Sequence, residues 1–411
     1  MKMFVNQDGL LLESISNNKP ILLILLLAFI VRIAVMWVYP DQYFPDAVAY
    51  KTIGKEIFAG QIITNNIYMP LYPIISFLTG GGKFQILFDI LISVISVWLI
   101  FLLSVQLFKD TLAGYIAAII SALYPHFLFY SVVGLTEVSF TFLLILSCLL
   151  FYREKIFLAI LVSILAILVK PTFDYLNPFL VILFCGVVHS VGWKKTCKFV
   201  GVYFLFYILI MSFWWFHQYH KYDKFVRLTL SDGIILYSGN NPLNASGGGV
   251  GRDSGASDMD LGKFDYIQNP IDRNNAMKTE AFKYISENPG RFIELSGVKF
   301  VRFWRLWPYT EHYQQWYIVA SSILSYGVVL FLSIGFLIRC TKKYFRELLP
   351  IYSIIGYLTF VHMITIGSIR YRFPIEPFLI IFASYFLIDI VREKNWFSKL
   401  AKIMNIDLKA I

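Results

Sequence analysis

Long apolar runs recur along almost the whole chain and constrain its fold more than any other feature. A helix needs about 20 mainly apolar residues to cross the hydrocarbon core of a bilayer. About ten runs approach or reach this length. They cover residues 20–38, 84–108, 112–130, 136–152, 156–169, 175–191, 200–217, 316–338, 348–367 and 374–391. The sequence therefore predicts an all-α polytopic membrane protein.

The composition supports this prediction because it excludes a soluble protein. Of the 411 residues, 58% are hydrophobic and only 15% are charged, whereas about 25% of the residues of a soluble domain are charged. So few charges cannot cover the surfaces of the two or three soluble domains expected for a chain of this length. The chain must therefore use lipid as its solvent.

The short loops between the runs indicate the orientation of the chain. Lys and Arg accumulate in the cytoplasmic loops of membrane proteins. With a cytoplasmic N-terminus, one side collects Lys109, Arg153, Lys155, Lys194, Lys195, Lys198, Arg339, Lys342, Lys343, Arg346, Arg392, Lys394, Lys399 and Lys402. This distribution explains the formal net charge of +10. We therefore expect membrane lipids as partners and no nucleic acid.

The same orientation divides the chain into three regions. Residues 1–217 form an N-terminal membrane module that includes a first outer segment, 39–83. Residues 218–315 form a large outer region, and residues 316–411 form the last spans and a cytoplasmic tail. A basic and aromatic helical pattern at 274–304, broken at Asn288-Pro289, is typical of interfacial helices. The cytoplasmic loops are short, so any chemistry is expected on the outer face.

Two acidic residues are candidates for that chemistry. Asp46 follows Pro45, an order that suits the start of a helix, where a carboxylate meets the positive end of the helix dipole. Tyr50 lies four residues later and would share a helix face with Asp46. Glu137 opens the run at 136–152, and an acid in a membrane helix is costly unless it is paired or hydrated. Simple helix capping is the alternative for both acids.

Three cations at the predicted outer face oppose the general bias of Lys and Arg toward the cytoplasm. Lys170 precedes Pro171, and Arg370 and Arg372 flank Tyr371 in the last outer loop. Arg matches phosphate oxygens with a planar fork, and Lys binds them as a point charge. Snorkelling toward lipid headgroups is the alternative. Together with the two acids, these cations indicate a lipid-phosphate substrate.

Several short motifs occur in a characteristic order along the chain. They are Asp46 with Tyr50, Tyr68-Met69-Pro70-Leu71-Tyr72-Pro73, Ala122-Leu123-Tyr124-Pro125, Thr136-Glu137, Ser238-Gly239-Asn240-Asn241-Pro242, Asn288-Pro289 and Arg370-Tyr371-Arg372-Phe373-Pro374. This order resembles the GT-C-fold glycosyltransferases that use a polyprenyl-phosphate sugar. The similar families are the protein O-mannosyltransferases, the lipid A aminoarabinose transferases and the rhizobial lipopolysaccharide transferases, and the resemblance covers most of the chain.

The resemblance implies a GT-C fold and an inverting hexosyl- or pentosyltransferase. The donor would be an undecaprenyl or dolichyl monophosphate sugar, and the acceptor a hydroxyl of a glycan, a lipid or a protein. Asp46 would accept the proton of that hydroxyl. The remaining candidates would bind the substrates: Tyr50, Glu137, Lys170, Asn240, Arg370, Tyr371 and Arg372. The expected location is a bacterial inner membrane with the site facing the periplasm, or alternatively the endoplasmic reticulum membrane.

Two positions depart from the pattern of these families. Ala47 stands where many members carry a second acid after the first-loop aspartate, so the resemblance leaves the need for a divalent cation open. Trp214-Trp215-Phe216-His217 differs from the WWDYG signature of oligosaccharyltransferases, which disfavours transfer to asparagine.

Other classes of protein also place charges near a membrane surface. A lipid or solute transporter without catalysis would do so, but it should carry paired broken helices and ionisable residues near the bilayer midplane. An O-antigen ligase or polymerase would use a diphosphate-linked donor and a site dominated by basic residues. Both remain alternatives to the glycosyltransferase interpretation.

Overall fold

The computed structural model describes residues 18–38, 44–61, 66–249, 260–310 and 313–393, and all regular elements within these ranges are helical. The α-helices are α2 (Lys19–Val38), α3 (Pro45–Phe58), α4 (Leu71–Leu78), α5 (Gly82–Phe108), α6 (Thr111–Leu123), α7 (Pro125–Tyr130), α8 (Thr136–Tyr152), α9 (Ile156–Ile167), α10 (Asn177–Ile182), α11 (Trp193–Tyr222), α12 (Asp232–Gly239), α13 (Pro270–Glu287), α14 (Pro289–Trp304), α15 (Trp316–Ser322), α16 (Val328–Arg339), α17 (Thr341–Ile364), α18 (Ile369–Arg372) and α19 (Glu376–Glu393). The expected all-α fold is confirmed. The tail cations Lys394, Lys399 and Lys402 lie outside the described residues.

The predicted membrane runs all fall on helices. Within the described residues, six helical segments are long and apolar enough to cross a bilayer: Lys19–Val38, Gly82–Phe108, Trp193–Tyr222, Trp316–Arg339, Thr341–Ile364 and Ile369–Glu393. Four further runs form shorter apolar helices: Thr111–Leu123, Thr136–Tyr152, Ile156–Ile167 and Asn177–Val188. The run at 112–130 is interrupted because Pro125 starts a new helix, α7, after the extended residue Tyr124. These helices define an integral membrane protein.

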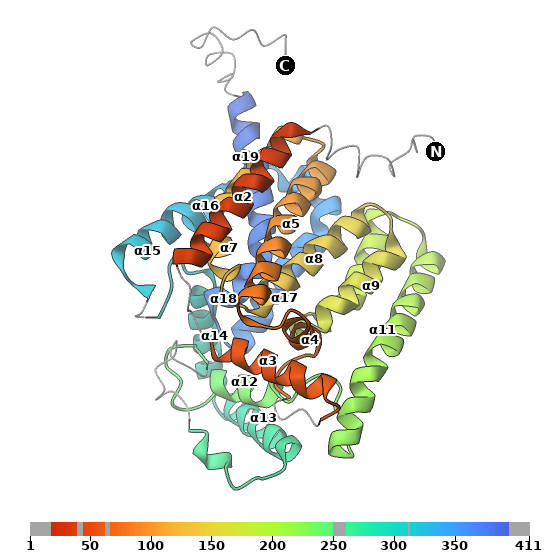
Figure 1. Ribbon diagram of the computed structural model, residues 1–411, viewed down its shortest axis with the longest axis vertical. Helices are drawn as coiled ribbons and strands as arrows, with labels where there is room; N and C mark the ends of the chain where they lie inside the picture. Colours follow the sequence, from red (N-terminus) through yellow and green to blue (C-terminus); the bar gives the residue numbers. More distant parts are fainter. Residues whose placement is uncertain (1–17, 39–43, 62–65, 250–259, 311–312, 394–411) are drawn as a thin grey trace.

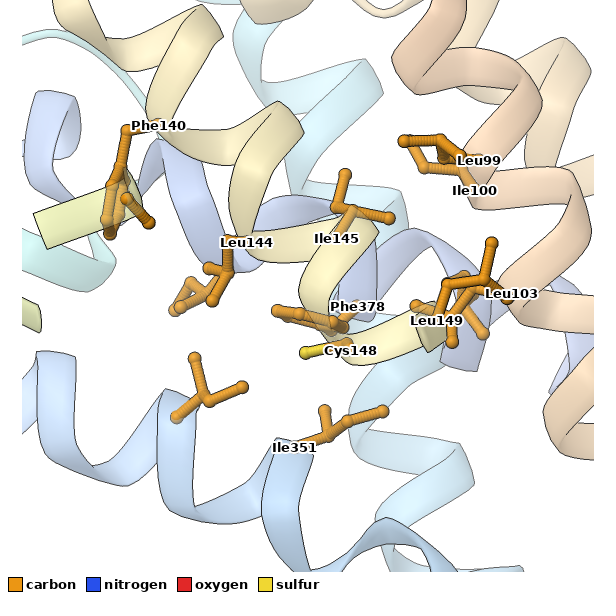
Figure 2. Packing of buried hydrophobic residues seen from close by; sticks show 14 of the residues in the cluster. Leu99, Ile100, Leu103, Phe140, Leu144, Ile145, Cys148, Leu149, Ile351 and Phe378 are labelled. Carbon is orange, nitrogen blue, oxygen red and sulfur yellow. The ribbon is translucent and has the colours of Figure 1, made fainter. Parts of the chain in front are cut away.

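Helix α8 lies at the centre of the apolar core. Figure 2 shows side chains of α8, including Leu144 and Cys148, packed between α5, α17 and α19. Neighbouring helices therefore surround α8, whereas α11 keeps exposed apolar side chains such as Phe213 and Ile208, as a helix that faces lipid would. The position of α8 matters for function because its first turn carries Glu137.

The loops predicted to be cytoplasmic lie together at one end of the molecule. The contacts at this end join Arg392 to Asp110, the Tyr152 hydroxyl to the Glu347 carbonyl (2.6 Å), and Arg346 Nε to the Val187 carbonyl (2.7 Å). Helices α3, α12 and α13 lie at the opposite end (Figure 1). The loops thus lie at two opposite ends, as the Lys and Arg distribution predicts, and the assignment of one end to the cytoplasm stays a prediction.

The region between α11 and α15 forms a helical unit beside α3. The predicted break at Asn288-Pro289 separates α13 from α14, where Pro289 supplies the first residue of the second helix. Helix α11 continues to Tyr222, so the regional boundary drawn at residue 217 falls inside a helix. Part of the glycine-rich stretch, residues 250–259, lies outside the described residues.

Candidate functional site

Four charged residues from distant parts of the chain meet at the end of the molecule that holds α3. Pro45 starts α3, and its fixed φ suits the first position of a helix, so Asp46 falls in the first turn. Glu137 lies in the first turn of α8, Lys170 precedes the short helix η1 (Pro171–Phe173), and Arg370 lies in α18. We call these four residues the Arg370 cluster.

Arg370 is the centre of the cluster because its guanidinium bridges both carboxylates. Nη1 donates to Asp46 Oδ2 at 2.7 Å, while Nε donates to Glu137 Oε1 at 2.5 Å and Nη2 to Glu137 Oε2 at 3.4 Å. Lys170 Nζ donates to Glu137 Oε1 at 2.8 Å. Charge-assisted contacts of this kind hold a site in a defined geometry. The formal charges of the two acids and the two cations cancel.

Burial divides the cluster into a closed side and an open side. Glu137 is fully buried, whereas Asp46 is 26% exposed, Arg370 27% and Lys170 17%. A buried carboxylate needs such partners to remain ionised. Burial and the neighbouring Arg370 lower the pKa of Lys170, although Glu137 opposes them. Glu137 therefore holds Arg370 and Lys170 in place from the buried side of the cluster. Asp46 and Arg370 form its accessible surface.

A tyrosine that sequence reasoning did not assign to the site completes the coordination of Asp46. The Tyr68 hydroxyl donates to Asp46 Oδ1 at 2.8 Å, and burial together with the Asp46 charge raises the pKa of this phenol, so that it stays a donor. Tyr68 is the first residue of one of the motifs noted in the sequence. Its contact with Asp46 could not be predicted because the two residues lie 22 positions apart in the chain.

Tyr50 supports this tyrosine and is itself out of reach of a substrate. Its ring is 1% exposed and makes edge contacts with the rings of Tyr68 and Tyr72, at centroid distances of 4.8 and 5.0 Å. The prediction that Tyr50 lies in the same helix as Asp46 is confirmed. Its position favours a packing role over the direct substrate contact expected from the sequence, because the side chain is enclosed.

Tyr371 contacts the cluster through Lys170. Its ring lies 5.7 Å from Lys170 Nζ and stacks on His362 with a centroid distance of 4.4 Å and an interplanar angle of 2°. A cation over an aromatic face is stabilised by the ring quadrupole. The expected participation of Tyr371 in the site thus takes the form of a platform beside Lys170.

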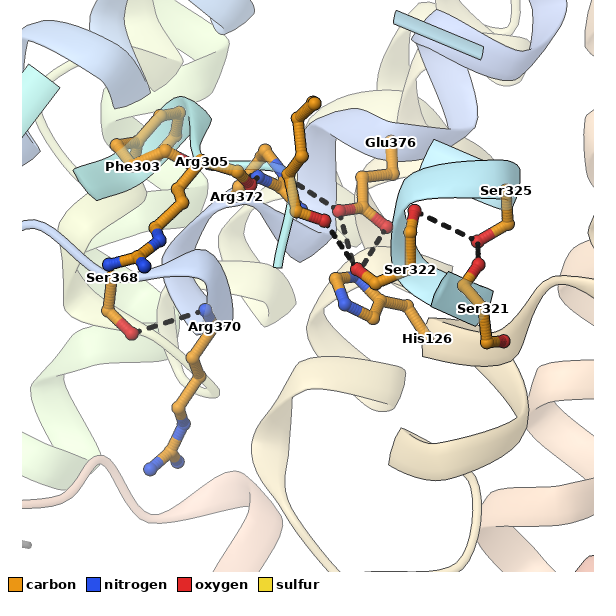
Figure 3. Close-up of polar contacts among 11 residues, drawn as sticks. His126, Phe303, Arg305, Ser321, Ser322, Ser325, Ser368, Arg370, Arg372 and Glu376 are labelled. Atoms are coloured by element: carbon orange, nitrogen blue, oxygen red, sulfur yellow. Dashed lines mark hydrogen bonds and ion pairs between the residues drawn. The ribbon is translucent and has the colours of Figure 1, made fainter. Parts of the chain in front are cut away.

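Arg372 does not join the cluster, in contrast to what the sequence led us to expect. Figure 3 shows the Arg370 and Arg372 side chains pointing in different directions. Arg372 is fully buried, donates from Nε to Glu376 Oε1 at 2.8 Å and from Nη1 to the carbonyls of Phe303 and Arg305, and lies over the Tyr326 ring. This arrangement ties the end of α14 to α18 and α19. Because residues two apart on a helix point about 200° apart, only one of the two arginines can face Asp46.

Asn240 also lies apart from the cluster. It is fully buried, and its Oδ1 accepts a hydrogen bond from Lys299 Nζ at 2.9 Å. Lys299 Nζ also donates to the Ile364 carbonyl at the end of α17, and burial lowers the pKa of this lysine to about 7. A side chain at Gly239 would collide here, since a Cβ would lie 1.8 Å from the Thr365 oxygen. Asn240 therefore helps to anchor the loop that leads to Arg370.

The carboxylates of the cluster do not fit a resident divalent cation. A metal ion between Asp46 and Glu137 would have to displace the Arg370 guanidinium that already bridges them. Within the described ranges, no group of three or more His, Cys, Asp or Glu side chains could hold a metal ion. In this arrangement Arg370 occupies the position between the two carboxylates that a bridging cation would take.

The fold that carries this site is similar to that of the archaeal oligosaccharyltransferases. A crystal structure of the Archaeoglobus fulgidus oligosaccharyltransferase in the apo form matches 94% of this chain with a TM-score of 0.56 and 11% identity. The oligosaccharyltransferase AglB from the same organism, in complex with an inhibitory peptide and a dolichol-phosphate, matches 94% of this chain with a TM-score of 0.57 and 14% identity. The expected GT-C fold is thereby confirmed.

The similarity is one of structure and covers part of those enzymes. The chain spans 52% of the length of each of these two oligosaccharyltransferase chains. No protein-family model matches the sequence, and no curated protein matches it. The two neighbours therefore show the fold of the protein, an all-α GT-C fold.

Proposed function

We propose that the protein is a membrane glycosyltransferase that moves a sugar from a polyprenyl monophosphate to a hydroxyl group. The observation that carries this proposal is the Arg370 cluster, in which an accessible carboxylate, Asp46, lies beside two cations suited to a phosphate. The cluster lies where apolar helices end, so a lipid-linked substrate could remain in the bilayer while its headgroup reaches the site. The GT-C fold, shared with enzymes that transfer glycans, supports the same activity.

The proposed reaction uses one carboxylate. Asp46 accepts the proton of the acceptor hydroxyl, the acceptor oxygen forms a bond to the anomeric carbon, and the bond from that carbon to the phosphate oxygen breaks. The leaving lipid phosphate is a stable anion, so it needs neighbouring cations and no general acid. Arg370 and Lys170 supply these cations. Attack opposite to the leaving group inverts the anomeric configuration.

Glu137, Tyr50 and Tyr371 have supporting roles in this proposal. Glu137 is buried, so it acts on Arg370 and Lys170 rather than on the sugar. Tyr50 packs against Tyr68, and Tyr371 provides a flat surface next to Lys170. Arg372 and Asn240 act through the fold, since their partners are buried protein groups.

The proposed partners follow from the same chemistry. One structural neighbour contains a dolichol-phosphate, which supports a polyprenyl phosphate as the carrier here. The acceptor is proposed to be a hydroxyl of a glycan, a lipid or a protein at the outer face of a bacterial inner membrane, with the endoplasmic reticulum membrane as the alternative location. The absence of the WWDYG signature from 214–217 favours a hydroxyl over an asparagine acceptor.

A direct assay tests this proposal. The purified full-length protein in lipid nanodiscs would be incubated with a panel of undecaprenyl and dolichyl monophosphate sugars and a crude glycolipid acceptor fraction. Mass spectrometry should detect free polyprenyl phosphate together with a product heavier by one sugar residue. Parallel reactions with diphosphate-linked donors separate this activity from a ligase, and consumption of only the diphosphate donors would contradict the proposal.

A further inference from the structure

Asp46 has a partner on each of its two carboxylate oxygens. Oδ1 accepts from the Tyr68 hydroxyl at 2.8 Å, and Oδ2 accepts from Arg370 Nη1 at 2.7 Å. A proton that arrives on Asp46 while Arg370 is bound would end the charge-assisted contact. In the structure both oxygens of the Asp46 carboxylate are therefore occupied by hydrogen-bond donors. One of these contacts has to break before Asp46 can act as a base.

The two partners differ in how firmly they are fixed. Arg370 binds Asp46 by one arm at the open side of the cluster, while its other contacts go to the buried Glu137. An incoming phosphate can compete with Asp46 for Nη1 and leave the contacts with Glu137 intact. Arg370 can thus change its partner without leaving the cluster.

Tyr68 is held more firmly than this arm of Arg370. Its ring contacts Tyr50, which packs in turn against Tyr72, and the Tyr72 hydroxyl donates to the buried Asp89 at 2.7 Å. The Gln85 side chain donates to the same Tyr72 hydroxyl at 3.0 Å. This chain of packed and hydrogen-bonded side chains fixes the position from which Tyr68 reaches Asp46.

We propose that Tyr68 is a positioning residue that keeps Asp46 oriented by Oδ1 while the donor phosphate takes Arg370 from Oδ2. This inference rests on the proposed function. The released Oδ2 then faces the acceptor hydroxyl and takes its proton as the acceptor oxygen bonds to the anomeric carbon. The bond to the phosphate oxygen breaks, and the additional negative charge of the leaving lipid phosphate lies beside Arg370 and Lys170. The donor must therefore bind before Asp46 can accept the proton.

The first arm of the test observes Asp46 without requiring turnover. Farnesyl phosphate, a short prenyl monophosphate, would be titrated into the full-length protein in nanodiscs, with calorimetry to establish binding and uncharged farnesol as the control. Isotope-edited infrared difference spectra should show a shift of the Asp46 carboxylate band with farnesyl phosphate and none with farnesol. Asp46→Asn assigns the band.

The outcomes of this arm separate the two proposals. Binding that leaves the Asp46 band unchanged would overturn the partner exchange and leave the phosphate site intact. Failure of farnesyl phosphate to bind would contradict the phosphate site itself, and this inference with it. The titration and the spectra use the unmodified protein, and a variant is needed only to assign the Asp46 band.

The second arm tests Tyr68 with a matched control. Tyr207 donates to Asp174 at 2.6 Å, a contact of the same type away from the cluster. Tyr68→Phe should lower kcat roughly ten- to hundredfold, as expected for loss of a hydrogen bond to a charged group, and should leave the KM for the donor unchanged. Tyr207→Phe should change neither constant. Equal effects of the two variants, or a Tyr68→Phe effect confined to KM, would overturn the role of Tyr68.

Discussion

Two aspartates of this protein are held by the same two types of partner. Asp46 accepts from Tyr68 and pairs with Arg370, and Asp174 accepts from Tyr207 and pairs with Arg227. In both groups the tyrosine hydroxyl lies on Oδ1 and the arginine on Oδ2. Sequence and side-chain chemistry alone would not distinguish the two.

Burial and the surrounding charges distinguish them. The Asp174 side chain is 1% exposed, and burial raises the pKa of this carboxyl although Tyr207 and Arg227 oppose the change. Arg227 lies over the Tyr175 ring and has no second carboxylate among the described residues. Arg370, by contrast, also binds a second acid, Glu137, which pairs in addition with Lys170. An accessible carboxylate with an additional cation can carry out chemistry, whereas a buried carboxylate with the same two types of partner fastens the fold.

The largest expected effect comes from removal of the arginine in each group. Arg370→Gln should lower kcat about 10³-fold, because cations at a transferring phosphate contribute on this scale in other phosphate-dependent enzymes. Arg227→Gln should leave kcat within a small factor of the unmodified protein. The assay is sugar transfer under donor saturation, with thermal unfolding of both variants as the control. A similar loss of activity in both variants would remove the distinction between the groups.

A third arginine sharpens the comparison because it is fully buried. Arg372→Met leaves Glu376 with His126 as its remaining partner in the structure. Removal of one partner of a buried ion pair costs about 3–5 kcal/mol of stability. Chemical denaturation in detergent should show this loss, and donor affinity per folded molecule should remain unchanged. A variant with normal stability and weak donor binding would return Arg372 to the site.

Lys170 supplies the Arg370 cluster with a second cation. Among the described residues, the group of Asp174, Tyr207 and Arg227 has one cation, Arg227. Lys170→Gln removes one charged donor from Glu137 and one positive charge from the proposed phosphate position. The KM for the donor should rise roughly ten- to hundredfold, since contacts to charged groups contribute about 1.5–3 kcal/mol. Lys170→Arg should restore part of the affinity because the charge is kept. Unchanged affinity in Lys170→Gln would contradict the phosphate contact and leave Lys170 only as the partner of Glu137.

The smallest effect concerns the outer region that supports Arg370. The pKa of Lys299 is lowered to about 7 in the folded protein, whereas an unfolded lysine titrates near 10.5. Between these values the unfolded chain binds more protons, so this lysine makes stability rise with pH in that window and adds nothing further above it. From pH 7 to 9 the gain should be about 2 kcal/mol. Lys299→Met should show a flatter profile, and an identical profile in the variant would contradict the buried, neutral amine.

The sequence predicted the helices and the two ends of the molecule because both depend on local composition. Apolar length defines the spans, and the placement of Lys and Arg sorts the loops. Asp46, Glu137, Lys170 and Arg370 could be selected because charge is costly near a membrane core and is rare in this chain.

The remaining features depend on contacts between distant segments. The sequence does not say which of Arg370 and Arg372 faces Asp46, because the rotation of a one-turn helix is decided by packing against its neighbours. Tyr68 could not be selected for the same reason, since its role comes from the position of α3 relative to the following loop. Asn240 was expected at the site, but its partners Lys299 and Ile364 belong to other segments.

The most direct test of the central claim compares the two aspartates themselves. Asp46→Asn and Asp174→Asn would be measured side by side for transfer from a polyprenyl monophosphate sugar, with thermal unfolding of each variant. Asp46→Asn should lower turnover by about 10²–10⁴, the contribution of a general base, in a protein that remains folded, and Asp174→Asn should lower stability with turnover per folded molecule retained. Near-normal turnover in Asp46→Asn would contradict the account.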